Sequence, residues 1–190
     1  MARYSDAWAG ARGQDATRAT RGRTWATLLP VPGPSDVLLI RHASAIDETL
    51  ELRDPHRHLT VEGRQQARAL GDRLRWHDCE PTHLWSSPLV RAIQTAELVA
   101  LTLGSGTLIE SMPSLGPEGH PRDVAAAIAK LPADALVMVF GHEPTISALG
   151  ALLTNDTDFP AIAKAEAVRI HDGRVRWRFA WNAEAPTPNV

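Results

Sequence analysis

The sequence contains a single cysteine, Cys79, among its 190 residues. One cysteine cannot form an internal disulfide, and the chain has no Cys-x-x-Cys pattern that would indicate a zinc or redox site. We therefore expect a reducing compartment, the cytoplasm. We also expect Cys79 to be a bystander rather than a reactive thiol.

Long hydrophobic runs and a strong net charge are also missing. The longest apolar segments, such as residues 135–140, are far too short to span a bilayer. The formal net charge is −2, whereas nucleic-acid binding usually needs a strongly basic face. We therefore expect neither a nucleic-acid nor a membrane partner. A hydrophobic content of 44% with 22% charged residues is ordinary for a soluble globular protein.

The composition divides the chain into three parts. Residues 1–35 combine five arginines with Gly, Ala and Thr and end in a Pro/Gly cluster, which is a linker signal. No segment there has the apolar length of a secretory signal. We expect an N-terminal extension that is flexible or loosely docked, with Trp8 and Trp25 as candidate docking points. Residues 36–182 form the predicted folded domain, and residues 183–190 form a C-terminal tail.

From residue 36 onward, strand patterns alternate with helix patterns. Unbroken apolar runs predict buried strands over 36–40 and 135–140, and shorter strands are expected over 82–85 and 107–110. Residues 165–170 and 174–181 flank Asp172-Gly173, a strong signal for a hairpin turn. The repeated units predict an α/β fold: three α/β/α layers, a mostly parallel central sheet, and a C-terminal antiparallel hairpin at one edge.

Four helices are expected between these strands. Thr60 is a plausible N-cap for a helix that runs to about residue 76 and carries Val61, Ala67, Leu70 and Leu74 near one stripe. The second predicted helix begins at Pro88, with Ser87 as its cap, and ends near Gly104. The third and fourth cover residues 122–130 and 145–153.

Positively charged and imidazole side chains follow three of the predicted strands. Arg41-His42 follows the first strand, residues 87–91 follow the second and end in Arg91, and Gly141-His142 follows the fourth. Ligands of open α/β sheets bind at the carboxyl ends of the strands. Arginine offers a rigid fork of donors to an oxyanion, and histidine can be an uncharged nucleophile near neutral pH. Two arginines and two histidines at one sheet edge suit a dianion such as phosphate.

Four ordered motifs resemble those of the histidine phosphatase (phosphoglycerate-mutase-like) superfamily. They are Arg41-His42-Ala43, residues 57–67 (Arg-His-Leu-Thr-Val-Glu-Gly-Arg-Gln-Gln-Ala), residues 87–96 (Ser-Pro-Leu-Val-Arg-Ala-Ile-Gln-Thr-Ala) and Gly141-His142-Glu143-Pro144. The resemblance covers about residues 36–182. The most similar branch is the compact SixA-like group of protein phosphohistidine phosphatases, because the chain has no room for the large helical insertion of acid phosphatases and phytases.

The resemblance implies a role for each site residue. His42 would attack phosphorus and become a phosphohistidine, with its other ring nitrogen bonded to a backbone carbonyl. Arg41 and Arg91 would bind the non-bridging oxygens and offset charge in the transition state. His142, cationic when phosphate is present, would donate a further hydrogen bond. Arg57 would close over the phosphate, unless it is an ordinary solvated loop arginine. The resemblance implies no metal or other cofactor.

Two positions depart from the family pattern. Ala43 replaces the usual Gly after Arg-His, so the backbone cannot approach phosphate quite as closely, a change we expect to be tolerated. Many phosphomonoesterases of the superfamily place a general acid in the loop after the third strand. Here Glu118 is an approximate match and Glu143, beside His142, is another candidate. An imidazole leaving group needs less protonation than an alkoxide, so the weak match favours a phosphoramidate substrate.

We therefore expect a metal-independent phosphatase that works through a covalent intermediate on His42 and dephosphorylates phosphohistidine in a protein. An alternative is a small-molecule phosphomonoesterase acting on a sugar or glycerate phosphate. An alternative of another class is a non-catalytic phosphate-binding module, against which the intact set of His42, Arg41, Arg91 and His142 argues.

Overall fold

The computed structural model describes residues 36–183 and 187–188. The extension predicted over residues 1–35 lies outside the described residues, as does most of the tail predicted over residues 183–190. No helix in the described ranges is both long and apolar enough to cross a membrane.

A seven-stranded sheet forms the middle layer, with the strand order β3-β2-β4-β1-β5-β6-β7. Its parallel half contains β1 (Asp36–Arg41), β2 (His83–Ser86), β3 (Ile109–Ser111) and β4 (Leu136–Gly141). Its antiparallel half contains β5 (Glu166–His171), β6 (Arg174–Ala180) and the two-residue β7 (Thr187–Pro188). The predicted fold class is confirmed, and β7 extends the predicted hairpin by one short strand.

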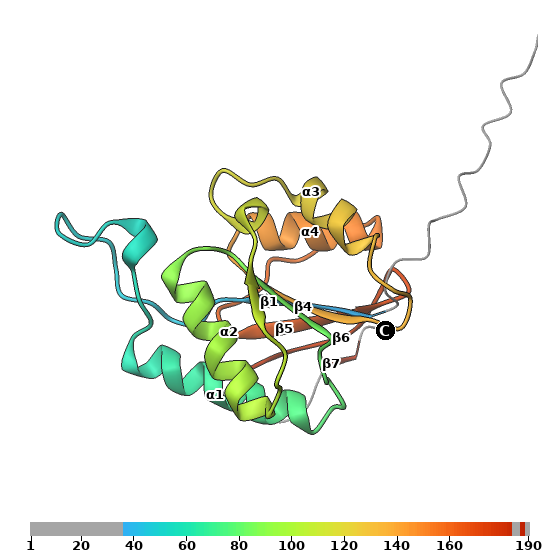
Figure 1. Cartoon of the computed structure of the whole chain (residues 1–190), viewed down its shortest axis with the longest axis horizontal. Helices are drawn as coiled ribbons and strands as arrows, with labels where there is room; N and C mark the ends of the chain where they lie inside the picture. Colours follow the sequence, from blue (N-terminus) through green and yellow to red (C-terminus); the bar gives the residue numbers. More distant parts are fainter. Residues whose placement is uncertain (1–35, 184–186, 189–190) are drawn as a thin grey trace, which may run out of the picture.

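Four helices cover the two faces of the sheet and complete the three layers (Figure 1). Helices α1 (Val61–Arg75) and α2 (Val90–Leu103) lie together on one face, and α3 (Pro121–Ile128) and α4 (Thr145–Thr154) lie together on the other. Two single-turn 3-10 helices, η1 (Asp54–His56) and η2 (Pro113–Leu115), interrupt the loops after β1 and β3.

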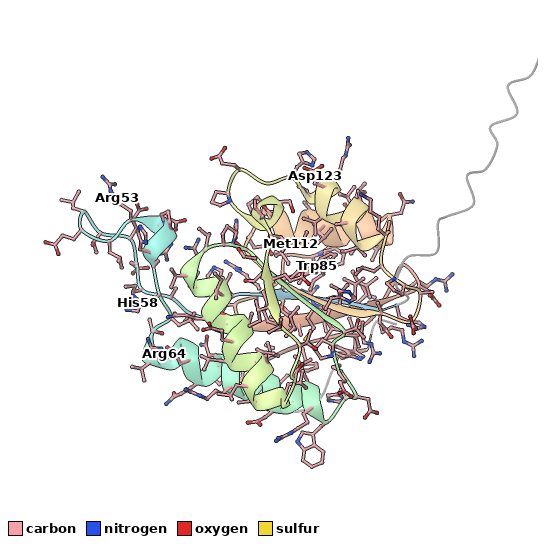
Figure 2. The ribbon with its side chains drawn as sticks, in the orientation of Figure 1. Arg53, His58, Arg64, Trp85, Met112 and Asp123 are labelled. Atoms are coloured by element: carbon pink, nitrogen blue, oxygen red, sulfur yellow. The ribbon has the colours of Figure 1, made fainter. Side chains whose placement is uncertain are left out.

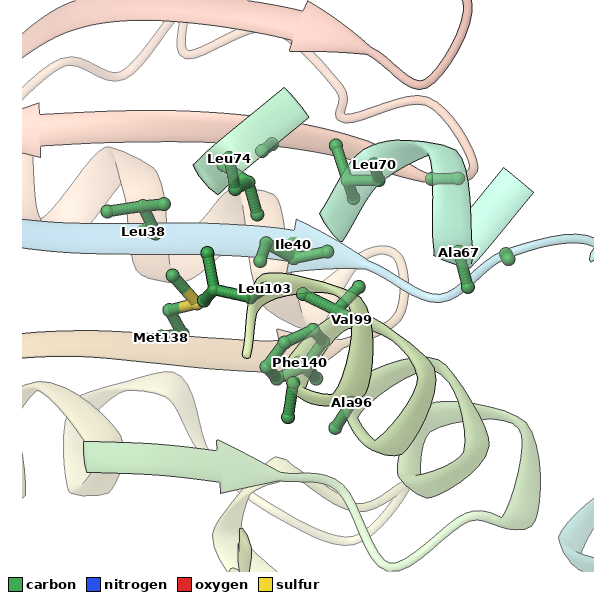
Figure 3. Packing of buried hydrophobic residues seen from close by; sticks show 14 of the residues in the cluster. Leu38, Ile40, Ala67, Leu70, Leu74, Ala96, Val99, Leu103, Met138 and Phe140 are labelled. Atoms are coloured by element: carbon green, nitrogen blue, oxygen red, sulfur yellow. The ribbon is translucent and has the colours of Figure 1, made fainter. Parts of the chain in front are cut away.

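The two faces of β1 enter two different hydrophobic cores. Leu38 and Ile40 pack beneath α1 and α2, together with Met138 and Phe140 of the neighbouring β4 (Figure 3). The alternate residue Leu39, with Val37, packs against residues from α3 and α4. Because successive side chains of a strand point to opposite faces, burial on both faces requires the unbroken apolar run seen in the sequence.

Local signals place several element boundaries where the sequence predicts them. The Thr60 hydroxyl accepts a hydrogen bond from the Gly63 N–H at 2.9 Å, so it caps α1. Gly104 ends α2 in the left-handed conformation, with φ of 81°. Asp172 and Gly173 both have positive φ and form the turn between β5 and β6.

The start of α2 differs from the prediction. The helix begins at Val90 after an extended Leu89, without a side-chain cap, and not at Pro88 after a Ser87 cap. The reason is that the Ser87 N–H donates to the Phe140 carbonyl at 2.9 Å, which holds the chain extended along β4 beyond the end of β2. Val61 was also misplaced by the stripe prediction: it is the first residue of α1 and is 72% exposed.

Gly71 determines how closely α1 and α2 can pack. A Cβ at this position would collide with the Thr102 hydroxyl and lie 2.7 Å from the Val99 carbonyl oxygen. Gly71→Ala should therefore lower the free energy of unfolding by roughly 1–3 kcal/mol in urea titrations, the usual cost of overpacking. Gly106→Ala is the matched control, because no atom lies within 4 Å of its Cβ position. Equal effects of the two substitutions would contradict the packing interpretation.

Candidate active site

Three parallel strands end at one edge of the sheet and deliver the polar side chains predicted there. Arg41 is the last residue of β1 and lies opposite Gly141, the last residue of β4. The next residue on each strand is a histidine, and the His42 N–H donates to the Gly141 carbonyl at 3.0 Å. Arg91 comes from the first turn of α2, directly after β2. The strand ends thus bring the nucleophile candidate and its cationic neighbours to one place.

His42 is held in a single tautomer by its own loop. His42 is 6% exposed, and its Nδ1 lies 2.7 Å from the Ala43 carbonyl oxygen, which can only accept a hydrogen bond. The proton therefore sits on Nδ1, and Nε2 keeps its lone pair. Arg91 donates from Nε to that lone pair at 3.3 Å. The bond to a backbone carbonyl is the one expected of the nucleophile.

The surroundings of His42 keep its ring uncharged. Burial, together with the positive charges of Arg91 and Arg41 and the neighbouring His142, lowers the pKa of His42 to about 4, against the opposing effect of the Ala43 hydrogen bond. Burial, followed by the charge of Arg91, also lowers the pKa of His142. An unprotonated imidazole at neutral pH is what nucleophilic attack requires.

Arg91 is 5% exposed and uses all three of its nitrogens. Nη1 donates to the Asp54 backbone carbonyl at 2.8 Å, and Nη2 donates to Asp54 Oδ2 at 3.2 Å. Asp54 belongs to η1, in the loop between β1 and α1. Its other carboxylate oxygen, Oδ1, accepts from Arg57 Nη1 at 3.0 Å. Arg57 therefore reaches the site through Asp54, a residue that the sequence analysis did not single out.

Arg41 and His142 each have a buried nitrogen without a protein partner. Arg41 Nη1 donates to the Ile162 carbonyl at 2.9 Å, whereas its Nε has no partner. His142 Nδ1 is the second such atom. Within the described residues, these two are the buried side-chain nitrogen or oxygen atoms that have no hydrogen-bond partner. Buried polar groups are nearly always hydrogen-bonded, so two unsatisfied nitrogens in the predicted set indicate a place for a polar ligand.

The two carboxylates considered as general acids occupy different positions. Glu143 Oε1 accepts hydrogen bonds from the Ser147 hydroxyl at 2.6 Å and from the Ile162 N–H at 2.8 Å, so it ties the start of α4 to the loop before β5. Glu118 is exposed, and no hydrogen bond or ion pair joins it to the described part of the chain. The structure therefore brings neither carboxylate into contact with His42.

A second group of residues supports the nucleophile loop. The Ala43 N–H donates to the Thr95 hydroxyl at 3.1 Å, and that hydroxyl donates to the Arg91 carbonyl at 2.7 Å. The Ser44 N–H donates to Gln66 Oε1 at 3.0 Å. Ala43 is fully buried and is not among the residues with positive φ, so an L-residue fits there without strain, as expected. Thr95 and Gln66 lie in the quoted motifs, and their position within those motifs is the signal that could have identified them.

Neither a metal cluster nor a reactive thiol is found in the described ranges. No group of three or more His, Cys, Asp or Glu side chains within residues 36–183 and 187–188 could hold a metal ion. Cys79 is buried, and burial raises the pKa of its thiol to about 11. A thiol with so high a pKa is a poor nucleophile at neutral pH, which agrees with its interpretation as a bystander.

The sequence model of the histidine phosphatase superfamily (branch 1) matches residues 37–116, the stretch that carries Arg41, His42, Arg57 and Arg91. The match covers 80 of the 190 residues, so this stretch is similar in sequence to the superfamily. His142 lies beyond the matched stretch and is brought to the same site by β4. The motifs that suggested the resemblance are therefore the ones that meet at this edge of the sheet.

Similar proteins are named as phosphatases. The mitochondrial serine/threonine-protein phosphatase Pgam5 of Caenorhabditis briggsae is 37% identical over 86 residues, which cover 45% of this chain and 28% of Pgam5. The chain thus spans little more than a quarter of that relative. The structure of the protein histidine phosphatase SixA with tungstate is similar in fold, with a TM-score of 0.68 at 24% identity over 77% of this chain and 97% of SixA. A Nakamurella multipartitia protein named as a SixA phosphohistidine phosphatase is 28% identical, with a TM-score of 0.61. The match covers 74% of this chain and 86% of the Nakamurella chain. These comparisons show a shared fold and a partial sequence similarity to proteins named as phosphatases.

The protonation state of His42 can be measured directly by NMR of its ring nitrogens. We expect the Nδ1–H tautomer at neutral pH and a titration midpoint near a pKa of about 4. The unfolded chain takes up this proton near the ordinary pKa of ~6.5. The contribution of the neutral His42 to the free energy of unfolding is therefore fully present above the unfolded-state pKa and is lost as the pH falls toward the folded-state pKa. A midpoint at the ordinary value would show that the site does not hold the ring neutral.

Thr95→Val should separate the loop-supporting role of Thr95 from its packing. Valine keeps the shape but leaves the buried Ala43 N–H without an acceptor, at a cost of roughly 1–3 kcal/mol in unfolding free energy. Because Ala43 also binds the His42 ring, kcat should fall as the nucleophile loses its fixed orientation. Thr95→Ser keeps the hydroxyl and should retain most of kcat. An equal loss of kcat in both variants would refute the role of the hydroxyl.

Proposed function

We propose that this protein is a metal-independent phosphatase in which His42 attacks phosphorus and carries the phosphoryl group. The observation that carries the proposal is the buried His42 ring, whose Nδ1–H is bonded to the Ala43 carbonyl and whose Nε2 lone pair faces Arg91. A neutral imidazole among arginines has the nucleophilic lone pair and the surrounding charge that phosphoryl transfer needs.

The proposed reaction has two displacements at phosphorus. In the first, the Nε2 lone pair forms a bond to phosphorus, and the bond from phosphorus to the leaving group breaks, with its electrons passing to the leaving group. Arg41 and Arg91 bind the non-bridging oxygens and offset their charge. His142 becomes cationic beside the dianion and donates a further hydrogen bond. In the second displacement, water attacks the phosphohistidine and releases inorganic phosphate, which restores His42.

We favour protein phosphohistidine as the substrate. The support is that neither predicted general acid is placed for proton transfer: Glu143 is engaged as an acceptor by Ser147 and Ile162, and Glu118 is exposed without a side-chain partner among the described residues. Imidazole leaves from phosphorus with less help from an acid than an alkoxide does. The similarity in fold to SixA agrees with this substrate class. The single buried cysteine is compatible with action in the cytoplasm, which is part of the proposal.

Phosphate esters are the second candidate substrate class. The observation that favours them is the 37% identity to Pgam5, which is named as a serine/threonine-protein phosphatase and therefore acts on esters. A small sugar or glycerate phosphate belongs to the same chemical class. The two classes differ in the leaving atom, nitrogen or oxygen, and a comparison of rates distinguishes them.

The enzyme proposal is tested by trapping the intermediate. Wild-type protein incubated with a labelled phosphohistidine protein and quenched should carry label that is labile in acid and stable in alkali, and His42→Ala should carry none. His171→Ala is the control, since His171 pairs with Asp36 at the opposite end of β1 and should not affect labelling. Unlabelled wild-type protein would overturn the covalent mechanism.

The same preparations test the substrate class. We expect kcat/KM for the phosphohistidine protein to exceed that for a phosphoserine peptide and for glycerate phosphates. Faster hydrolysis of either ester, with the label still trapped on His42, would reassign the substrate and leave the covalent mechanism intact.

A further inference from the structure

The edge of Arg91 that would bind a phosphate is occupied by two other groups of the protein. The Nε and Nη2 atoms of an arginine share one edge of the guanidinium, which binds two oxygens of one anion. Arg169 uses this edge on Asp36, with Nε to Oδ1 at 2.8 Å and Nη2 to Oδ2 at 2.9 Å. On Arg91 the same edge is divided: Nε binds His42 Nε2, and Nη2 binds Asp54 Oδ2.

The Asp54 carboxylate contacts two arginines as a phosphate would. One oxygen accepts from Arg91 and the other accepts from Arg57, at 3.2 and 3.0 Å. The first of these contacts lies beside the lone pair of His42, where the phosphoryl group must bind if His42 is the nucleophile. The carboxylate therefore provides a negative charge at the position that the oxygens of a substrate would need.

We propose that Asp54 is an internal anion that occupies an oxygen position of the phosphate site, and that substrate binds by displacing it. The identity of the site as a phosphate site rests on the proposed function. Asp54 then sets the affinity of the site, because every phosphate ligand competes with a carboxylate of the protein. The released product, inorganic phosphate, competes with it in the same way and is therefore held less tightly.

The loop that carries Asp54 contains no fully buried residue. Every residue of this loop, residues 46–58, is exposed or only partly buried, and Leu50 is 90% exposed. The loop projects from the body of the protein, and Figure 2 shows Arg53 and His58 on it. Its contacts with Arg91 are polar, and a dianion gains more than a monoanion from the same two arginines. Phosphate can therefore replace the carboxylate.

The test is calorimetric titration of the full chain with inorganic phosphate. Asp54→Asn keeps the shape of the side chain and the backbone contact with Arg91 but removes the charge. We expect its Kd for phosphate to be about fivefold lower than that of wild type, which is the effect of removing a partly exposed ion pair. Inhibition by the product should strengthen by the same factor. Asp72→Asn is the matched control, because Asp72 pairs with Arg75 at 3.1 Å on the surface of α1 and should leave Kd unchanged.

Weaker or unchanged phosphate binding by Asp54→Asn would overturn the inference, because the carboxylate would then only hold Arg91 in place. If the wild-type protein traps label on His42 while Asp54→Asn binds phosphate no more tightly, this inference fails and the proposed function stands. If wild type neither binds phosphate nor forms phosphohistidine, both fail. Asp54→Asn should still unfold cooperatively, with a Tm below that of wild type because the buried Arg91 loses its anion. Phosphate affinity is therefore compared at a temperature at which both proteins are folded.

Discussion

β1 and β4 pair in parallel with Arg41 opposite Gly141, and the His42 N–H continues the pairing to the Gly141 carbonyl at 3.0 Å. This register places Arg41 and His42, at the end of β1, beside His142, which follows β4. A slip of one residue would turn every side chain of β1 to the opposite face. Leu38 and Leu39 would then exchange between two well-packed cores, so the hydrophobic interior maintains the geometry of the site.

The electrostatics of the site follow from burial at that strand end. His42 is 6% exposed and surrounded by positive charge, so its ring cannot readily take up a proton and keeps the lone pair that the proposed attack on phosphorus needs. The same arrangement concentrates positive charge that needs a neutralising partner, because buried unpaired charge is costly. The Asp54 carboxylate neutralises Arg91, and the same contacts hold the Asp54 loop near the site. The reactive nitrogen and the carboxylate beside it are thus two consequences of one cationic environment.

The residues that the sequence identified have local or periodic signals. Apolar runs predicted β1 and β4 because both are buried on both faces, and the rule for parallel strands placed Arg41, His42 and His142 at one edge. The roles of Asp54 and Ile162 had no such signal. Asp54 meets Arg91 from 37 positions away in a loop without buried residues, and Ile162 contributes a backbone carbonyl, whose use does not depend on its side chain. The start of α2 was misjudged because a pairing with β4 outweighs the usual preference of Ser-Pro for a helix start.

The two arginines of the site are held in different ways, and this difference suits two different tasks. Arg41 donates to the carbonyl of Ile162, whose N–H is fixed by Glu143, so its position is set by backbone and by a half-buried carboxylate at the start of α4. Arg91 is held by a loop that buries nothing and by an anion that a phosphate resembles. A rigid donor costs no reorganisation when charge develops on phosphorus. A donor that exchanges its partner keeps the site neutralised between turnovers and makes binding selective for ligands that outcompete a carboxylate. Glu143 thus positions Arg41 through Ile162 and is engaged as a hydrogen-bond acceptor, which is a structural role and not that of a proton donor.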